Sequence, residues 1–93
     1  MNTFTKTPTA KTNAYKVTFD DGREINRNAK KDFTHAIIYS ADKGPWKVYG
    51  LASDVVKAAK SESACRSDFR AIRHGTYFKR ATPVRVEVLA LHK

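Results

Sequence analysis

Apolar and polar residues alternate along Tyr15-Lys16-Val17-Thr18-Phe19, which is the period of a strand that buries one face. Asp21-Gly22 follows, and this dipeptide favours a tight hairpin turn. The run from Arg23 to Arg27 is then expected to be the partner strand, with Ile25 facing inward. The first part of the chain therefore predicts a β-hairpin.

A second hairpin is expected directly afterwards. Residues Phe33 to Tyr39 form a β-branched and aromatic run that is typical of a central strand. Asp42-Lys43-Gly44-Pro45 is rich in turn-forming residues, and alternation returns in Trp46-Lys47-Val48-Tyr49. Residues 28–32 between the two hairpins are polar and basic and predict a connector.

One helix is predicted from the Ser53-Asp54 cap to His74-Gly75, because no Pro or Gly interrupts this stretch. Its apolar residues fall mostly on one side at 100° per residue, and Cys65 is among them. Glu62 falls on that same side, which allows a bend or break near residues 61–63. Cys65 is expected to be a small core residue and not a nucleophile.

The final strand is expected at Val84 to Val88, where apolar residues again alternate. The order β-β-β-β-α-β predicts an α+β fold, with one antiparallel sheet of about five strands and one helix packed on one face. Residues 1–13 are polar and Thr-rich and are expected to be a flexible arm or a loosely paired lead-in. Residues 14–93 are expected to be a single domain.

Net charge restricts the possible classes of function more than any sequence motif does. Eighteen Lys and Arg residues against nine Asp and Glu give a formal net charge of +9 and a pI near 9.9. A charge of this size attracts polyanions, and phosphate backbones are the commonest such partner. The alternative is a solvated basic surface with no specific ligand.

Enzyme signatures are absent from the sequence, which has no phosphate-binding glycine loop, dinucleotide fingerprint, zinc-protease motif or nucleophile elbow. His35, His74 and His92 lack metal-ligand spacing, and a single cysteine cannot form an internal disulfide. We expect His35 to be paired in the sheet, His74 to lie near the helix end and His92 to lie in a frayed tail. We therefore expect no enzyme activity, cofactor, metal, small-molecule substrate or membrane contact, and a cytoplasmic location.

Arginines dominate the predicted helix. Arg66, Arg70 and Arg73 are spaced i, i+4 and i+7, so a continuous helix would carry them as one ridge of guanidinium groups able to grip phosphates. The basic and aromatic residues that follow or support this ridge complete the expected binding surface. They are Tyr77, Lys79 and Arg80 after the helix, and Arg27, Lys30 and Lys31 before the central strand. The alternative is that these basic residues are ordinary solvated positions and that Tyr77 lies in the core.

The run Arg27-x-x-Lys30-Lys31-x-Phe33-Thr34-His35-Ala36-Ile37-Ile38 resembles small proteins of bacteriophages and mobile elements. Together with Tyr15–Arg23 and Trp46–Gly50, this resemblance covers about half the chain. In length and architecture the chain is similar to anti-CRISPR proteins that bind type I surveillance complexes. Many of those proteins are acidic DNA mimics, and the basic character of this chain departs from that pattern.

The resemblance implies a stoichiometric inhibitor in the bacterial cytoplasm. It would dock on an RNA-guided complex, contact guide RNA or acidic Cas surfaces, and block pairing of target DNA. The alternative hypothesis is a free DNA- or RNA-binding phage regulator, in which the same basic residues meet phosphates directly. Docking on protein should depend less on salt than binding to naked nucleic acid.

Overall fold

The computed structural model describes residues 1–41, 43–69, 72–74, 77–79 and 84–92, and for 72–74 and 77–79 it describes the backbone alone. Its elements are β1 (Thr3–Pro8), β2 (Asn13–Thr18), β3 (Glu24–Ala29), β4 (His35–Ala41), β5 (Lys47–Ala52), α1 (Val55–Asp68), β6 (Ile72–His74), β7 (Tyr77–Lys79) and β8 (Val84–Ala90). Both predicted hairpins, β2–β3 and β4–β5, are confirmed, as is the final strand.

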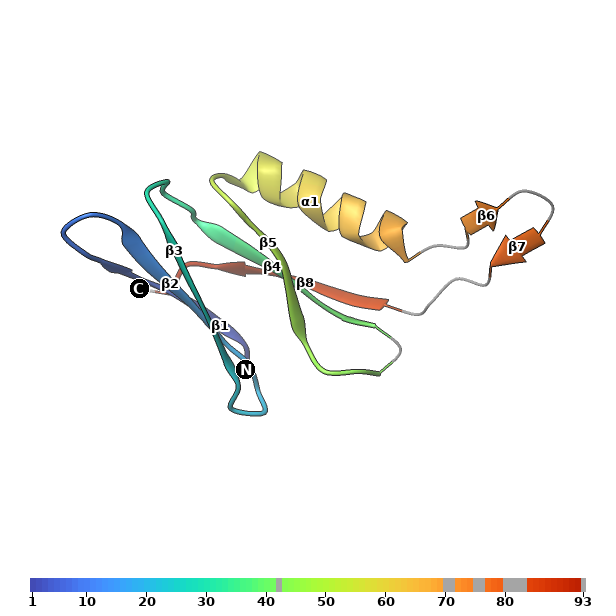
Figure 1. The fold of residues 1–93 in the computed structure, drawn as a ribbon, viewed down its shortest axis with the longest axis horizontal. Coiled ribbons are helices and arrows are strands. Elements are labelled where there is room, and N and C mark those ends of the chain that lie inside the picture. The colour runs from blue at the N-terminus through green and yellow to red at the C-terminus, as the bar shows by residue number, and fades with distance from the viewer. Residues whose placement is uncertain (42, 70–71, 75–76, 80–83, 93) are drawn as a thin grey trace.

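The strands divide into two three-stranded antiparallel sheets, β1-β2-β3 and β5-β4-β8, and the short β6-β7 pair (Figure 1). An isolated parallel bridge between Phe4 and Leu91 joins the two larger sheets, and the His92 backbone N–H donates to the Phe4 carbonyl oxygen at 2.8 Å. The α+β class is confirmed. The expected single sheet of about five strands is not confirmed, because β1 adds a strand and the longer strands divide into two three-stranded sheets.

The first core lies between the two sheets. Alternation along β2 turns Tyr15 and Val17 inward, and Ala36 and Ile38 of β4 face them from the other sheet. Gly22 has a φ of +90° in the β2–β3 turn, a left-handed conformation that glycine adopts without the steric cost other residues incur. The Asp21-Gly22 turn therefore fixes the β2–β3 hairpin and so aligns the inward face of the first sheet.

The second core lies between sheet β5-β4-β8 and helix α1, which covers that sheet on the side away from β1-β2-β3 (Figure 1). Asp54 caps the helix by accepting a hydrogen bond from the Lys57 backbone N–H at 2.7 Å. Ala58 and Cys65, seven residues apart, lie on one helix face and are fully buried against Ile37. Cys65 is thus a core residue, as its position predicted.

Of the two forms expected for residues 1–13, a flexible arm and a loosely paired lead-in, the structure contains a paired segment, because Thr3–Pro8 form β1 and pair with β2 over all six residues. Phe4 is completely buried, and its ring stacks on Tyr15 with 5.6 Å between centroids. The stretch is polar because Thr3, Thr5 and Thr7 face outward, and threonine is β-branched and favours strands. A polar composition that is typical of disorder therefore belongs here to a half-exposed strand.

The helix is shorter than predicted. It ends at Asp68, where the backbone N–H of the C-cap residue Phe69 donates to the Arg66 carbonyl oxygen, and β6 begins four residues later at Ile72. The Phe69 ring packs on Tyr39, with 5.2 Å between centroids. This packing ends the helix before Gly75, so tertiary contact overrides the helical propensity of the following residues. His74 consequently lies in β6 and not at a helix end.

Replacing Phe4 with Ala should lower the free energy of unfolding by about 3–5 kcal/mol, because it removes a fully buried ring that joins the two sheets. Urea unfolding followed by circular dichroism measures this change. Thr5→Ala, on the outward face of the same strand, is the control and should cost less than about 1 kcal/mol. Equal small effects of both changes would show that β1 is a dispensable arm.

Candidate polyanion-binding surface

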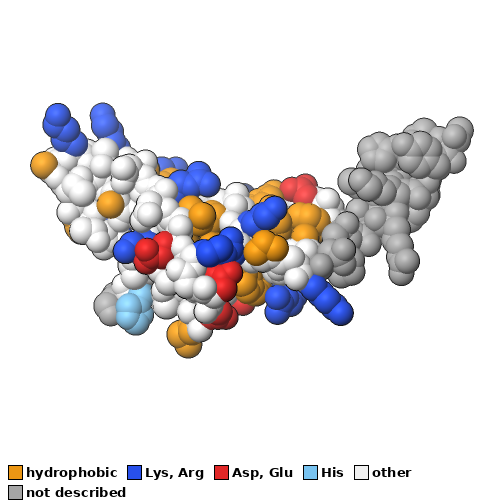
Figure 2. Space-filling view, turned by 60° about the horizontal axis from the view of Figure 1, so that its bottom comes forward, with side chains coloured by type: hydrophobic (Ala, Val, Ile, Leu, Met, Phe, Trp, Pro, Cys, Tyr) orange, Lys and Arg blue, Asp and Glu red, His pale blue; other side chains and the backbone are white. Residues whose placement is uncertain are grey.

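Charge is distributed unevenly along sheet β1-β2-β3. At one end, which we call the loop end, the β1–β2 hairpin and the β3–β4 loop bring together five cations and one carboxylate. These residues are Lys6, Lys11, Arg27, Lys30, Lys31 and Asp32. Figure 2 shows Lys and Arg side chains projecting from the left side, where Figure 1 places the β1–β2 hairpin. The loop end is therefore strongly positive.

The opposite end of the same sheet, at the β2–β3 turn, is compensated. Asp21 pairs with the Arg23 Nε at 2.7 Å, and Glu24 pairs with the Lys16 Nζ at 3.5 Å. Asp20 pairs with the N-terminal amine. A polyanion approaching the sheet is therefore attracted to the loop end and not to the turn.

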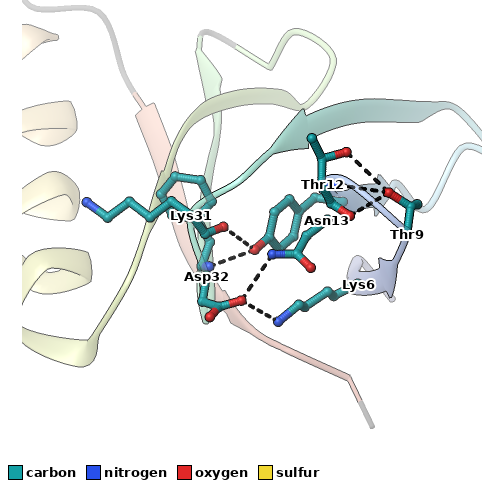
Figure 3. A network of polar contacts seen from close by, with 8 residues as sticks. Lys6, Thr9, Thr12, Asn13, Lys31 and Asp32 are labelled. Atoms are coloured by element: carbon teal, nitrogen blue, oxygen red, sulfur yellow. Dashed lines mark hydrogen bonds and ion pairs between the residues drawn. The ribbon is translucent and has the colours of Figure 1, made fainter.

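The Tyr15 hydroxyl fixes the β3–β4 loop in place. It donates to the Lys31 carbonyl oxygen at 2.6 Å and accepts from the Phe33 backbone N–H at 2.8 Å (Figure 3). The Phe33 ring packs edge-on against the Tyr15 ring at 5.5 Å, and the Lys31 Nζ lies 5.9 Å from the Phe33 ring centroid. A buried tyrosine thus holds the backbone that carries the loop lysines.

Asp32 ties the same loop to the β1–β2 hairpin. Its Oδ1 accepts from the Lys6 Nζ at 2.8 Å and from the Asn13 Nδ2 at 3.0 Å (Figure 3). The hydrogen bond and charge of Lys6, together with Asn13, hold the pKa of Asp32 below its ordinary value, and the bond to Asp32 raises the pKa of Lys6. Of the five cations at the loop end, Lys6 is thus paired with a carboxylate of the same protein.

The other four cations lie on ordered backbone and take part in none of the described ion pairs. Lys11 is exposed in a tight turn closed by the Thr9 Oγ1, which donates to the Thr12 carbonyl oxygen at 2.6 Å. Arg27 shares one row across the sheet with Lys6 and Tyr15 and is exposed on the edge strand β3. Lys30 and Lys31 are exposed in the loop that Tyr15 holds.

The arginine ridge expected on the helix is not formed. Arg66 lies in the last turn of α1 and pairs with Glu62 at 3.1 Å, whereas Arg73 lies in β6, beyond the end of the helix. The backbone of Tyr77 and Lys79 lies in β7, and Arg70 and Arg80 lie outside the described residues. The three supporting residues Arg27, Lys30 and Lys31 are the ones that the structure gathers.

Sequence reasoning missed Lys6, Lys11 and the hydroxyl of Tyr15. The alternation of Thr3, Thr5 and Thr7 was the available signal for β1, and reading it as a strand would have placed Lys6 on the inner face beside Tyr15. The partnership of Tyr15 with residues 31–33 had no sequence signal, because the contacts span 16 and 18 residues.

The histidines are placed as follows. His35 lies in β4, as expected, and its Nδ1 shares a hydrogen bond of 2.7 Å with the Thr34 Oγ1. His92, expected in a frayed tail, is tied to Phe4 through its backbone N–H. Among the described residues, no three His, Cys, Asp or Glu side chains are grouped as metal ligands would be, and no described helix has the length and apolar character needed to cross a membrane.

Comparison with known proteins finds no matching family model, no similar curated protein and no similar solved structure.

The Asp32 contacts predict a defined pH dependence. Because the folded-state pKa of Asp32 is depressed, its contribution to stability is present above the unfolded pKa of about 3.9 and is lost as pH falls through the folded value. Asp32→Asn should therefore lower Tm at pH 7 and leave it nearly unchanged at pH 2. Glu87→Gln, which removes a carboxylate outside the described ion pairs, is the control. A pH-independent effect of Asp32→Asn would contradict this role.

Proposed function

We propose that this protein is a non-enzymatic binding domain that grips the phosphate backbone of nucleic acid, free or within a nucleoprotein complex, through the loop end. The observation that carries the proposal is the clustering of Lys11, Arg27, Lys30 and Lys31 on backbone that Tyr15 and Asp32 fix. Cations on fixed backbone lose less conformational entropy on binding than cations on mobile chain. The arrangement thus favours capture of extended negative charge.

The composition of the loop end supports backbone contact more than base reading. Three of the four cations outside the described ion pairs are lysines, which act as point charges and select no particular base. The Phe33 ring of the same loop is partly covered by Lys31. Binding by this surface should therefore show little sequence preference. The affinity should come mainly from the release of counterions from the phosphates.

A narrower form of the proposal is an inhibitor of host defence of the anti-CRISPR type, in which the same cations contact guide RNA or acidic Cas surfaces and block target DNA sterically. The sequence resemblance supports this form. The alternative is a regulator that binds free DNA or RNA. Affinity for naked nucleic acid should fall steeply with salt in the second case, and co-purification with a defence complex should distinguish the first.

Neutralising the loop end should reduce both affinity and its salt dependence. For R27Q/K30Q/K31Q we expect the log–log slope of affinity against salt for duplex DNA to become shallower by about 2 to 3, since each phosphate contact contributes about 0.9. Fluorescence anisotropy with a labelled duplex at several salt concentrations measures the slope.

The matched control is K47Q/K57Q/K60Q, which removes the same net charge from exposed positions on β5 and α1. It should leave the slope nearly unchanged. An equal loss in both triple variants would show that the overall charge of +9, and not the loop end, attracts DNA. Absence of binding by the unmodified protein at low salt would overturn the proposal itself.

A further inference from the structure

A second cationic site lies at the turn between β4 and β5, far along the molecule from the β1–β2 hairpin (Figure 1). A surface cavity of about 120 Å³ opens there and is lined by Ser40, Lys43, Val84 and Arg85. Its volume is that of about four water molecules. It is therefore large enough for a small oxyanion, and a nucleoside attached to that oxyanion would lie outside the cavity.

Arg85 is held in position by two contacts. Its Nη2 donates to the Ser40 Oγ at 3.3 Å, and its guanidinium carbon lies 4.9 Å from the centroid of the Trp46 ring. Ser40 is almost fully buried, and its own hydroxyl proton is donated to the Gly44 carbonyl oxygen at 2.6 Å. The Ser40 oxygen is thus left as an acceptor that orients the guanidinium, and the remaining N–H groups of Arg85 donate to no other described residue.

Lys43 supplies the second cation. It lies in the tight turn that the Gly44 backbone N–H closes on the Ala41 carbonyl oxygen at 2.8 Å, and its φ of +58° places it in the left-handed region. The two cations come from different elements, one from the β4–β5 turn and one from β8. Neither is a member of the described ion pairs.

We infer that this cavity binds a single phosphate group, with Arg85 donating from its planar fork and Lys43 adding a second positive charge. A guanidinium held on one edge by a serine oxygen and on one face by an indole ring is preorganised for such an anion. The site is separate from the loop end, so the inference does not depend on the proposed function. It would give the protein a second contact for phosphate. The phosphate can be free or can belong to a nucleotide.

Trp46 provides an internal reporter, because it is the only tryptophan in the sequence and Arg85 lies over its ring. We would titrate the ¹⁵N-labelled protein with inorganic phosphate and, separately, with a nucleoside monophosphate. Chloride at matched ionic strength is the reference. Saturable shifts of the Trp46 indole N–H and of the amides of residues 40, 43 and 85 are expected. Tighter binding of the nucleotide would assign a nucleotide to the site, and equal binding would assign phosphate alone.

R85Q and K43Q should each weaken phosphate binding about tenfold, since a hydrogen bond to a charged group contributes roughly that factor. Arg85 and Lys43 are both exposed, so both variants should keep the native spectrum. K47Q is the control and should bind as the parent does, because Lys47 pairs with Tyr39, whose side chain packs on the helix side of the sheet.

Shifts that chloride reproduces, or phosphate binding that survives in R85Q/K43Q, would overturn the assignment. Repeating the titration in R27Q/K30Q/K31Q separates the two sites. Phosphate binding that persists there supports the cavity whatever becomes of DNA binding, and loss of the Trp46 response in that variant would show that the response arose at the loop end.

Discussion

The position of the basic loops depends on one buried hydroxyl. Tyr15 contributes its ring to the core between the two sheets and its oxygen to the backbone of residues 31 and 33. The same side chain therefore stabilises the fold and sets where the loop cations stand. Because a buried hydroxyl without partners would be costly, Tyr15 and the loop constrain each other.

The two sheets also explain why the charge is concentrated. The core between them is built from one face of each sheet, and one inward row near the loop end holds Lys6, Tyr15 and Arg27. Tyr15 is buried in that row, whereas Lys6 is half-buried and Arg27 is exposed. The positive surface thus borders an apolar face, and its residues keep the spacing of the strands beneath it.

Local pattern was sufficient to predict much of the fold. Alternation along residues 15–19, 46–49 and 84–88 and the Asp21-Gly22 turn predicted strands and hairpins that the structure contains. The helix begins at the Ser53-Asp54 signal, although Asp54 is the cap and not a carboxylate of the first turn. What pattern could not supply was long-range pairing. The place of Phe4 beside Leu91, the division into two sheets and the end of the helix at Phe69 all arise from contacts between distant segments.

The residues of the candidate site likewise divide into those that local pattern predicted and those that it did not. Arg27, Lys30 and Lys31 were recognised from their local density, whereas the helical ridge failed because its spacing assumed a helix continuing past Asp68. Lys6 and Lys11 were missed because the first strand was interpreted as an arm. Charge density on the sequence therefore predicted a polyanion as the partner class, and the strand register was needed to choose the candidate surface.

Direct mapping of the contact surface tests the loop end most sharply. When a short single-stranded oligonucleotide is added to the ¹⁵N-labelled protein at low salt, the amides of residues 9–12 and 27–33 should shift most. Shifts confined to α1, or spread evenly over all exposed lysines, would contradict a binding surface at the loop end.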